Sequence, residues 1–207
     1  MTGLEDLGLF PLPVVLLPGE RIPLHLFEPR YRTLFADCVL AERPFVLVLG
    51  TDEGTAGVGC AARFDTLVRR FADGRMNVLV SGAAPVEIVD ETEGRPYRSA
   101  RVRRLEDEQA TVDDGLADAA LGLYRRLAEQ VTGAPKDPEA PPGVPLSYAV
   151  AGAIELEAAV KQRLLETRRE DERLQLVHGI LTEAVQGIDR SRVAADRAQR
   201  NGRVTLT

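Results

Sequence analysis

Lysine, histidine and cysteine each occur only twice in this chain of 207 residues. The lysines are Lys136, which follows Pro135, and Lys161, which follows Val160. A nucleotide-binding P-loop needs Gly-Lys-Ser/Thr after a glycine-rich turn, because the lysine must reach the β and γ phosphates. Neither lysine has this context, so the sequence excludes a P-loop ATPase.

Serine is also scarce, and no serine lies in a Gly-x-Ser-x-Gly nucleophile elbow. The four serines are at positions 81, 99, 147 and 191. A serine–lysine dyad needs one of the two lysines beside a serine in the folded chain, and such partners can be distant in sequence. We predict no catalytic residues and no enzyme activity.

The two histidines and two cysteines show no close-spaced metal-ligand pattern, neither CxxC nor HExxH. A disulfide framework and a four-cysteine zinc site are therefore excluded. Counting alone leaves a mixed site of His25, His178, Cys38 and Cys60 open. However, His178 falls on a helical apolar stripe and both cysteines fit apolar positions. We expect no metal and no cofactor.

A cationic excess is absent, since 26 basic side chains face 32 acidic ones for a net charge of -6. Proteins that bind duplex nucleic acid normally carry a clear positive excess. Arg101, Arg103 and Arg104 can still form a local basic patch. Nucleic acid is thus a disfavoured partner.

Long apolar runs are absent as well. The most apolar early segment, residues 10–17, contains Pro11 and Pro13 and is far too short to span a bilayer. No basic stretch precedes an apolar run at the N-terminus. We expect a cytoplasmic protein in a reducing compartment, with no membrane partner.

The first half of the chain is typical of short strands around one helix. Pro29 fits the first position of a helix that ends before Pro44, and Asp73-Gly74 predicts a hairpin with a type I′ turn. Gly54, Gly57 and Gly59 predict a mobile turn. The predicted strands are residues 14–17, 45–49, 58–64, 66–71, 75–80, 85–89 and 97–105.

The second half has helical periodicity. Thr111 is the predicted N-cap of a helix that ends at Gly133, and a proline-rich loop follows over residues 135–145. Residues 146–167 predict a helix with a break near Gly152 or Glu157. Thr167 and Glu170 have capping-box spacing before a last helix with a long apolar stripe.

These patterns predict an α+β fold, in which a small β-barrel of about six strands plus one helix precedes an α-helical bundle. We assign residues 1–108 to the β-rich part and 109–190 to the helical bundle. Residues 191–207 are a charged tail, either a solvated extension or frayed.

Four ordered blocks resemble the N-terminal substrate-binding domain of the ATP-dependent Lon protease. They are Leu9-Phe10-Pro11-Leu12-Pro13-Val14-Val15-Leu16-Leu17-Pro18-Gly19 with Pro23-Leu24-His25-Leu26-Phe27-Glu28-Pro29-Arg30-Tyr31, Val58 to Ala62, Asp73 to Gly82, and Tyr97 with Ala100 to Leu105. The resemblance implies a PUA-like β pseudo-barrel followed by helices, in a stand-alone bacterial member without ATPase or protease.

The resemblance also implies a binding role. Unfolded or extended polypeptide segments are the implied partners, and a separate protease is a further one. The protein would act as an adaptor in protein quality control or as a competitor. Glu28, Pro29 and Arg30 are expected to start a helix and pair charges, with Tyr31 packed beneath.

The candidate peptide-binding residues are His25, Phe27, Arg30 and Tyr31, which would rim a groove for extended polypeptide. Such a groove would work by apolar contact and by strand addition at the open edge of the barrel. Two alternatives stay open from the sequence: an uncharacterised hydrolase or peptidase, and an RNA-binding PUA-like module.

Overall fold

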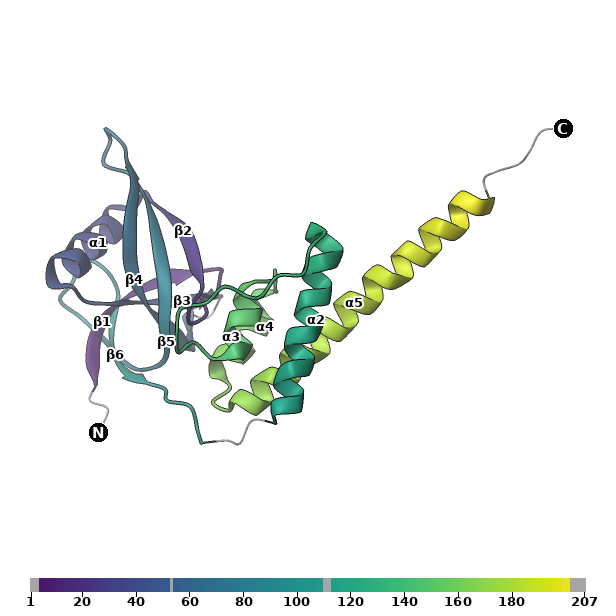
Figure 1. The fold of residues 1–207 in the computed structure, drawn as a ribbon. Helices are drawn as coiled ribbons and strands as arrows, with labels where there is room; N and C mark the ends of the chain where they lie inside the picture. The colour runs from purple at the N-terminus through teal and green to yellow at the C-terminus, as the bar shows by residue number, and fades with distance from the viewer. Residues whose placement is uncertain (1–3, 53, 110–112, 202–207) are drawn as a thin grey trace.

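A computed structural model describes residues 4–52, 54–109 and 113–201 of the chain. A β-rich part comes first, and the helices that follow it pack on one of its sides, with the last helix projecting outward (Figure 1). The elements are β1 Glu5–Leu12, β2 Arg21–Leu26, α1 Pro29–Ala41, β3 Phe45–Thr51, β4 Gly54–Arg70, β5 Met76–Thr92, β6 Ser99–Arg104, α2 Asp114–Thr132, α3 Leu146–Gly152, α4 Ala158–Glu166 and α5 Glu170–Asn201.

The strands form a small barrel. Their order is β2-β5-β4-β3-β1-β6, and an additional pairing of β5 with β6 closes five of them into a ring. The β1–β3 pair is parallel and the other pairs are antiparallel. This arrangement confirms the predicted α+β fold, with six strands and one helix before the helical part. Strand β2 extends the ring at β5, and its other edge pairs with no strand in the described part of the chain.

Three predictions for the strands and turns differ from the structure. Residues 14–17 are not a strand, although Leu16 and Leu17 are fully buried. The apolar run correctly indicated burial, but its backbone crosses β5 at Gly82, where an added Cβ would collide with the Leu17 carbonyl. Residues 54–59 belong to β4 instead of a separate turn, and residues 85–89 continue the long strand β5.

The predicted hairpin is present, but its turn differs from type I′. Only Gly74 has a positive φ, of 85°, whereas type I′ needs positive φ at both central residues. The Phe71 N–H donates to the Arg75 carbonyl at 2.9 Å, and the Gly74 N–H donates to the Phe71 carbonyl at 3.0 Å. The loop therefore contains three residues, with glycine in the left-handed position.

The helical half follows the prediction except at two N-caps. Asp113 caps α2 by accepting from the Gly115 N–H at 2.9 Å, while the predicted cap Thr111 lies outside the described residues. The end at Gly133 and the break between α3 and α4 are confirmed. Helix α5 continues to Asn201, into the segment predicted to be a charged tail.

The prediction of a capping box at the start of α5 is also wrong. Thr167 donates its hydroxyl to the Arg163 carbonyl of the preceding helix at 2.8 Å. The Glu170 carboxylate instead accepts from the N–H of Ser147 at 3.0 Å. A tertiary contact with the first turn of α3 therefore replaces the local cap.

One hydrophobic core joins the two halves. It runs from Phe10 and Leu34 through Leu16 to Tyr148 and Leu181, so it contains side chains of the barrel, α1 and the helical part. A second, smaller cluster draws alternating residues from all five strands of the closed ring, among them Leu9, Val48 and Val102. The predicted apolar stripe of α5 is buried in the shared core or beside it, at Leu174, Val177, Leu181 and Val185.

The buried side chain of Arg173 connects the helical half to the end of the barrel. It is fully buried and bonds both carboxylate oxygens of Asp107, with 2.7 Å for Nη1 to Oδ1. It also donates to Glu170 at 2.8 Å and to Ser147 Oγ at 3.0 Å. Its guanidinium lies 4.4 Å from the ring centroid of Tyr148. Three segments thus meet at one cation.

We predict that Arg173→Met lowers the free energy of unfolding by about 3–5 kcal/mol, because it leaves carboxylates without their buried partner. Urea unfolding followed by circular dichroism measures the change. Arg126→Met is the control, since its pair with Asp189 at 2.7 Å is solvent-exposed and contributes about 1 kcal/mol or less. Equal losses in the two variants would contradict a special role for Arg173.

We further predict that the thiols are unreactive in the folded protein. Burial raises the pKa of Cys60 to about 12 and that of Cys38 to about 11. At pH 8 a thiol-specific reagent should label the native protein at least about a hundredfold more slowly than the urea-unfolded chain, whose thiols have a pKa of about 8.5. Because the unfolded thiols ionise first, the free energy of unfolding should fall as pH rises from about 9 to 12. Fast native labelling would show that the thiols are accessible.

Candidate functional site

Strand alternation divides β2, β5 and β4 into a buried and an exposed side. Leu24, Leu26, Met76 and Val78 point into the core and are buried. Their neighbours point the other way, and the register aligns His25 with Asn77 and Asn77 with Arg69. We call this exposed side the outer hairpin face. Its residues are Pro23, His25 and Phe27 in and just after β2, Arg69 and Phe71 at the end of β4, and Arg75, Asn77 and Leu79 around the start of β5.

Three rings gather on the outer hairpin face. His25 stacks with Phe27 at a centroid distance of 6.1 Å and an interplanar angle of 23°. It meets Phe71 edge-on at 6.0 Å. His25 Nδ1 and Asn77 Oδ1 are 2.6 Å apart, which fixes the imidazole on the strand. Phe27 is 60% exposed, so a ring of this cluster is available to a ligand.

Two arginines flank the Phe71 ring. The guanidinium carbon of Arg69 lies 4.7 Å from the ring centroid and that of Arg75 lies 5.5 Å from it. Arg75 also pairs with Asp73 at 2.6 Å. Arg69 has no carboxylate within ion-pair distance in the described part of the chain. The face therefore combines aromatic rings with an available cation.

The four residues predicted from the sequence separate into two pairs. His25 and Phe27 lie together on the outer hairpin face. Arg30 sits on the first turn of α1, pairs with Glu28 at 2.7 Å and lies 4.6 Å over the Tyr31 ring. Tyr31 is buried against Phe10, with ring centroids 4.0 Å apart, and its burial raises its pKa. The expected charge pairing and packing at the start of α1 are thus present.

The sequence reasoning missed Arg69, Phe71 and Asn77 as parts of this face. The alternation of residues 75–80 indicated that Asn77 faces outward, but a register shift between Leu67 and Arg69 breaks the alternation in β4, so the pattern did not indicate the side of Arg69. Which strand lies beside β2 depends on the order of strands in the sheet. Ile22 and Val80, for example, become neighbours only when β2 pairs with β5. The signal was therefore incomplete.

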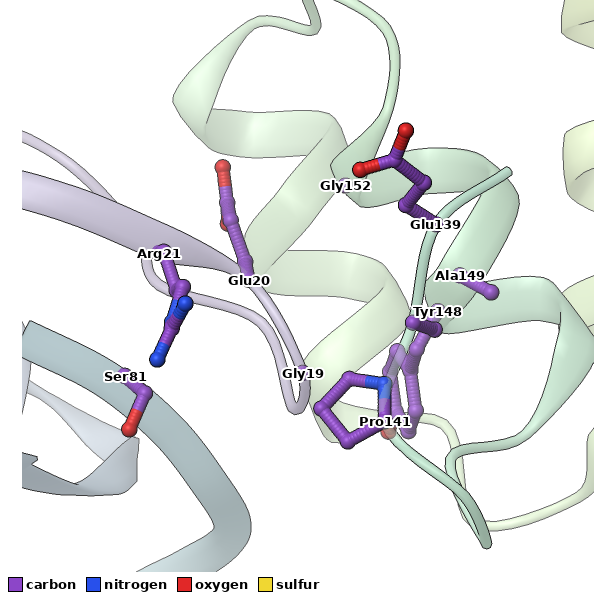
Figure 2. A pocket seen from close by; sticks show the side chains of 10 residues that line it. Gly19, Glu20, Arg21, Ser81, Glu139, Pro141, Tyr148, Ala149 and Gly152 are labelled. Atoms are coloured by element: carbon purple, nitrogen blue, oxygen red, sulfur yellow. The ribbon is translucent and has the colours of Figure 1, made fainter. Parts of the chain in front are cut away.

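A separate cleft of about 530 Å³ lies between the barrel and the helical part (Figure 2). Its lining includes Glu20, Arg21, Ser81, Glu139, Pro141 and Tyr148. The Glu20 carboxylate is bound by the Lys161 ammonium and by the Leu17 N–H. Arg21 pairs with Asp65 at 3.1 Å. The charged groups from the barrel are thus engaged within the protein.

All four serine hydroxyls form hydrogen bonds within the protein. Within residues 4–52, 54–109 and 113–201, none of them bonds a lysine or a histidine. Their partners are Asp65 for Ser81, Thr92 for Ser99, Glu170 and Arg173 for Ser147, and the Gly187 carbonyl for Ser191. The same residues contain no group of three or more His, Cys, Asp or Glu side chains able to hold a metal ion.

Two of the three arginines in the basic cluster of β6 form ion pairs across the strands. Arg101 pairs with Asp90 at 2.7 Å and Arg103 pairs with Glu87 at 2.5 Å, both on β5. These two arginines are therefore not free to bind the phosphates of a nucleic-acid backbone. Among the helices that the structure describes, none is long and apolar enough to cross a membrane.

Comparisons with known proteins agree with this architecture. A Lon protease from Phenylobacterium zucineum (strain HLK1) is 28% identical over 209 residues, which cover 92% of this chain and 26% of that protein. The Lon N-terminal domain protein from Xanthomonas campestris has a similar fold, with a TM-score of 0.65 and 24% identity over 83% of this chain and 95% of that one. The N-terminal domain of the Mycobacterium avium complex Lon protease also has a similar fold. Its TM-score is 0.59, and it is 19% identical over 88% of this chain and 98% of that one.

The chain spans about a quarter of the length of the curated relative that it matches. A family model covers residues 6–183, that is, the barrel and most of the helical part. This match confirms the resemblance that the four sequence blocks indicated. The chain belongs to the family of ATP-dependent protease La (LON) substrate-binding domains.

Proposed function

We propose that this protein binds exposed segments of other polypeptides on the outer hairpin face and performs no catalysis itself. The observation that carries the proposal is the cluster of His25, Phe27 and Phe71 on a sheet, with Phe27 60% exposed. Aromatic side chains bury a large area at low conformational cost, which makes them frequent anchors at protein interfaces. Membership of a substrate-binding family supports a polypeptide as the ligand.

The face of the sheet, instead of its edge, is the proposed contact surface. The Gly82 N–H donates to the Glu20 carbonyl at 3.0 Å, so alternation directs the backbone groups of residues 21, 23 and 25 to the free edge of β2. Pro23 lies in the middle of this edge and has no N–H to donate. An added strand would lose a hydrogen bond there, and proline at an edge commonly prevents such pairing.

Within this proposal the four candidate residues have different roles. His25 and Phe27 contact the bound segment, and Arg30 lies at the rim, exposed on the first turn of α1. Tyr31 supports the site from the core and does not contact the ligand. The adaptor role in quality control is part of the same proposal: a segment held on this face is presented to a protease.

The hydrolase alternative lacks a favouring observation, because the described serines bond carboxylates, a threonine, an arginine and a carbonyl. The RNA alternative is opposed by the paired arginines of β6. Polypeptide binding is therefore the function that the geometry supports best.

We predict that Phe27→Ala weakens binding of a fluorescein-labelled, reduced and carboxymethylated model protein by about tenfold, the usual effect of removing an aromatic anchor. Fluorescence anisotropy gives the Kd. Since Phe27 is largely exposed, the free energy of unfolding in urea should stay within about 0.5 kcal/mol of that of the parent.

Leu40→Ala is the matched control, because Leu40 is 88% exposed on α1 and lies outside the outer hairpin face. It should leave the Kd unchanged. The proposal fails if the parent protein shows no binding, or if Phe27→Ala and Leu40→Ala weaken binding equally.

A further inference from the structure

Positive charge is concentrated around the outer hairpin face of an otherwise acidic protein. Residues 21–32 and 63–75 contain seven arginines and three carboxylates, whereas the whole chain has a net charge of -6. The arginines are Arg21, Arg30, Arg32, Arg63, Arg69, Arg70 and Arg75. This segregation gives the aromatic cluster a local potential opposite in sign to that of the whole molecule.

The three carboxylates each neutralise one of these arginines. Asp65 pairs with Arg21, Asp73 with Arg75, and Glu28 with Arg30. None of the ion pairs between described residues involves Arg69, and only Arg69 among the remaining arginines also lies against a ring of the aromatic cluster. It is consequently the cation best placed to meet a ligand held by the rings.

The position of Arg69 suits a carboxylate. A guanidinium that stacks by its face on an aromatic ring keeps its in-plane N–H donors directed outward, where they match the two oxygens of a carboxylate. Arg69 lies two strands from His25 in the aligned row, a separation of about 10 Å at roughly 4.8 Å per strand. An extended peptide covers this distance in about three residues.

We propose that the outer hairpin face selects acidic segments, in which an aromatic or large apolar residue has Asp or Glu within three positions. The aromatic residue packs on His25 and Phe27, and the carboxylate binds Arg69. This inference rests on the proposed function and adds a preference that peptide binding alone does not require.

A peptide fits these features better than RNA. Single-stranded RNA binding uses a continuous groove of cations along the backbone together with stacked bases. Here Asp65, Asp73 and Glu28 interrupt the arginines, and each would repel a phosphate. Arg69, which lies against the Phe71 ring, matches one carboxylate beside one aromatic side chain.

The test uses three labelled peptides of equal length, each with a central Phe flanked on both sides by Glu, by Gln or by Lys. Fluorescence anisotropy with the full chain at low salt should show the Glu peptide binding about fivefold more tightly than the Gln peptide, and the Lys peptide more weakly than either. At about 0.5 M NaCl the three Kd values should converge, because salt screens exposed charges.

Arg69→Gln should abolish the preference for Glu over Gln while changing the Kd of the Gln peptide less than about twofold. Arg69→Lys should keep part of the preference, since it keeps the charge and loses the planar donor geometry. Arg126→Gln, an exposed arginine on α2, is the control and should keep the full preference. Urea unfolding of each variant checks that the fold is intact.

The outcomes separate this inference from the proposed function. Equal binding of all three peptides, still lost in Phe27→Ala, overturns the acidic preference and leaves peptide binding in place. Absence of binding by every peptide overturns both. A twelve-nucleotide single-stranded RNA that binds more tightly than the Glu peptide and displaces it identifies a nucleic-acid site and overturns the inference.

Discussion

The burial of the Arg173 guanidinium is the constraint on which the arrangement of the two halves depends. A cation removed from water needs opposite charge and hydrogen-bond acceptors around it. Asp107 arrives from the end of the barrel, Glu170 from the start of α5 and Ser147 from α3, and each is required in place to satisfy the cation. The helical part therefore has a defined orientation on the barrel.

The hydrophobic contacts around this network bury apolar surface, and the hydrogen bonds of the network fix how the two halves are oriented. Apolar side chains such as Leu16, Leu164 and Leu181 gain from burial in many arrangements, because the hydrophobic effect is not directional. Hydrogen bonds to a planar guanidinium form in one arrangement, because its donors have a fixed geometry. The second cross-link, between Lys161 and Glu20, lies at the same junction and uses the more buried of the two lysines.

This junction also explains why the outer hairpin face stays open. The helical part and α1 cover the inward sides of β2, β4 and β5, where Leu26, Val78 and Phe64 lie. On the opposite side His25, Phe27 and Arg69 are exposed, so the rings meet solvent while the sheet supports them from behind. A surface of this kind meets a ligand with little rearrangement, which reduces the entropy cost of binding.

The sequence by itself determined that a β-rich half precedes a helical half, and it determined the helix α1, the hairpin at Gly74 and the split between α3 and α4. It also determined the family. These features follow from local periodicity, turn residues and ordered motifs. Segment 14–17 shows the limit: apolarity predicts burial, but whether a buried segment pairs as a strand depends on its neighbours. The same holds for the caps, since Glu170 was free to cap its own helix or α3. Only the tertiary structure placed Phe71 and Arg69 on the same face as His25, because the order of strands in a sheet is set by packing between distant segments, and no local pattern encodes it.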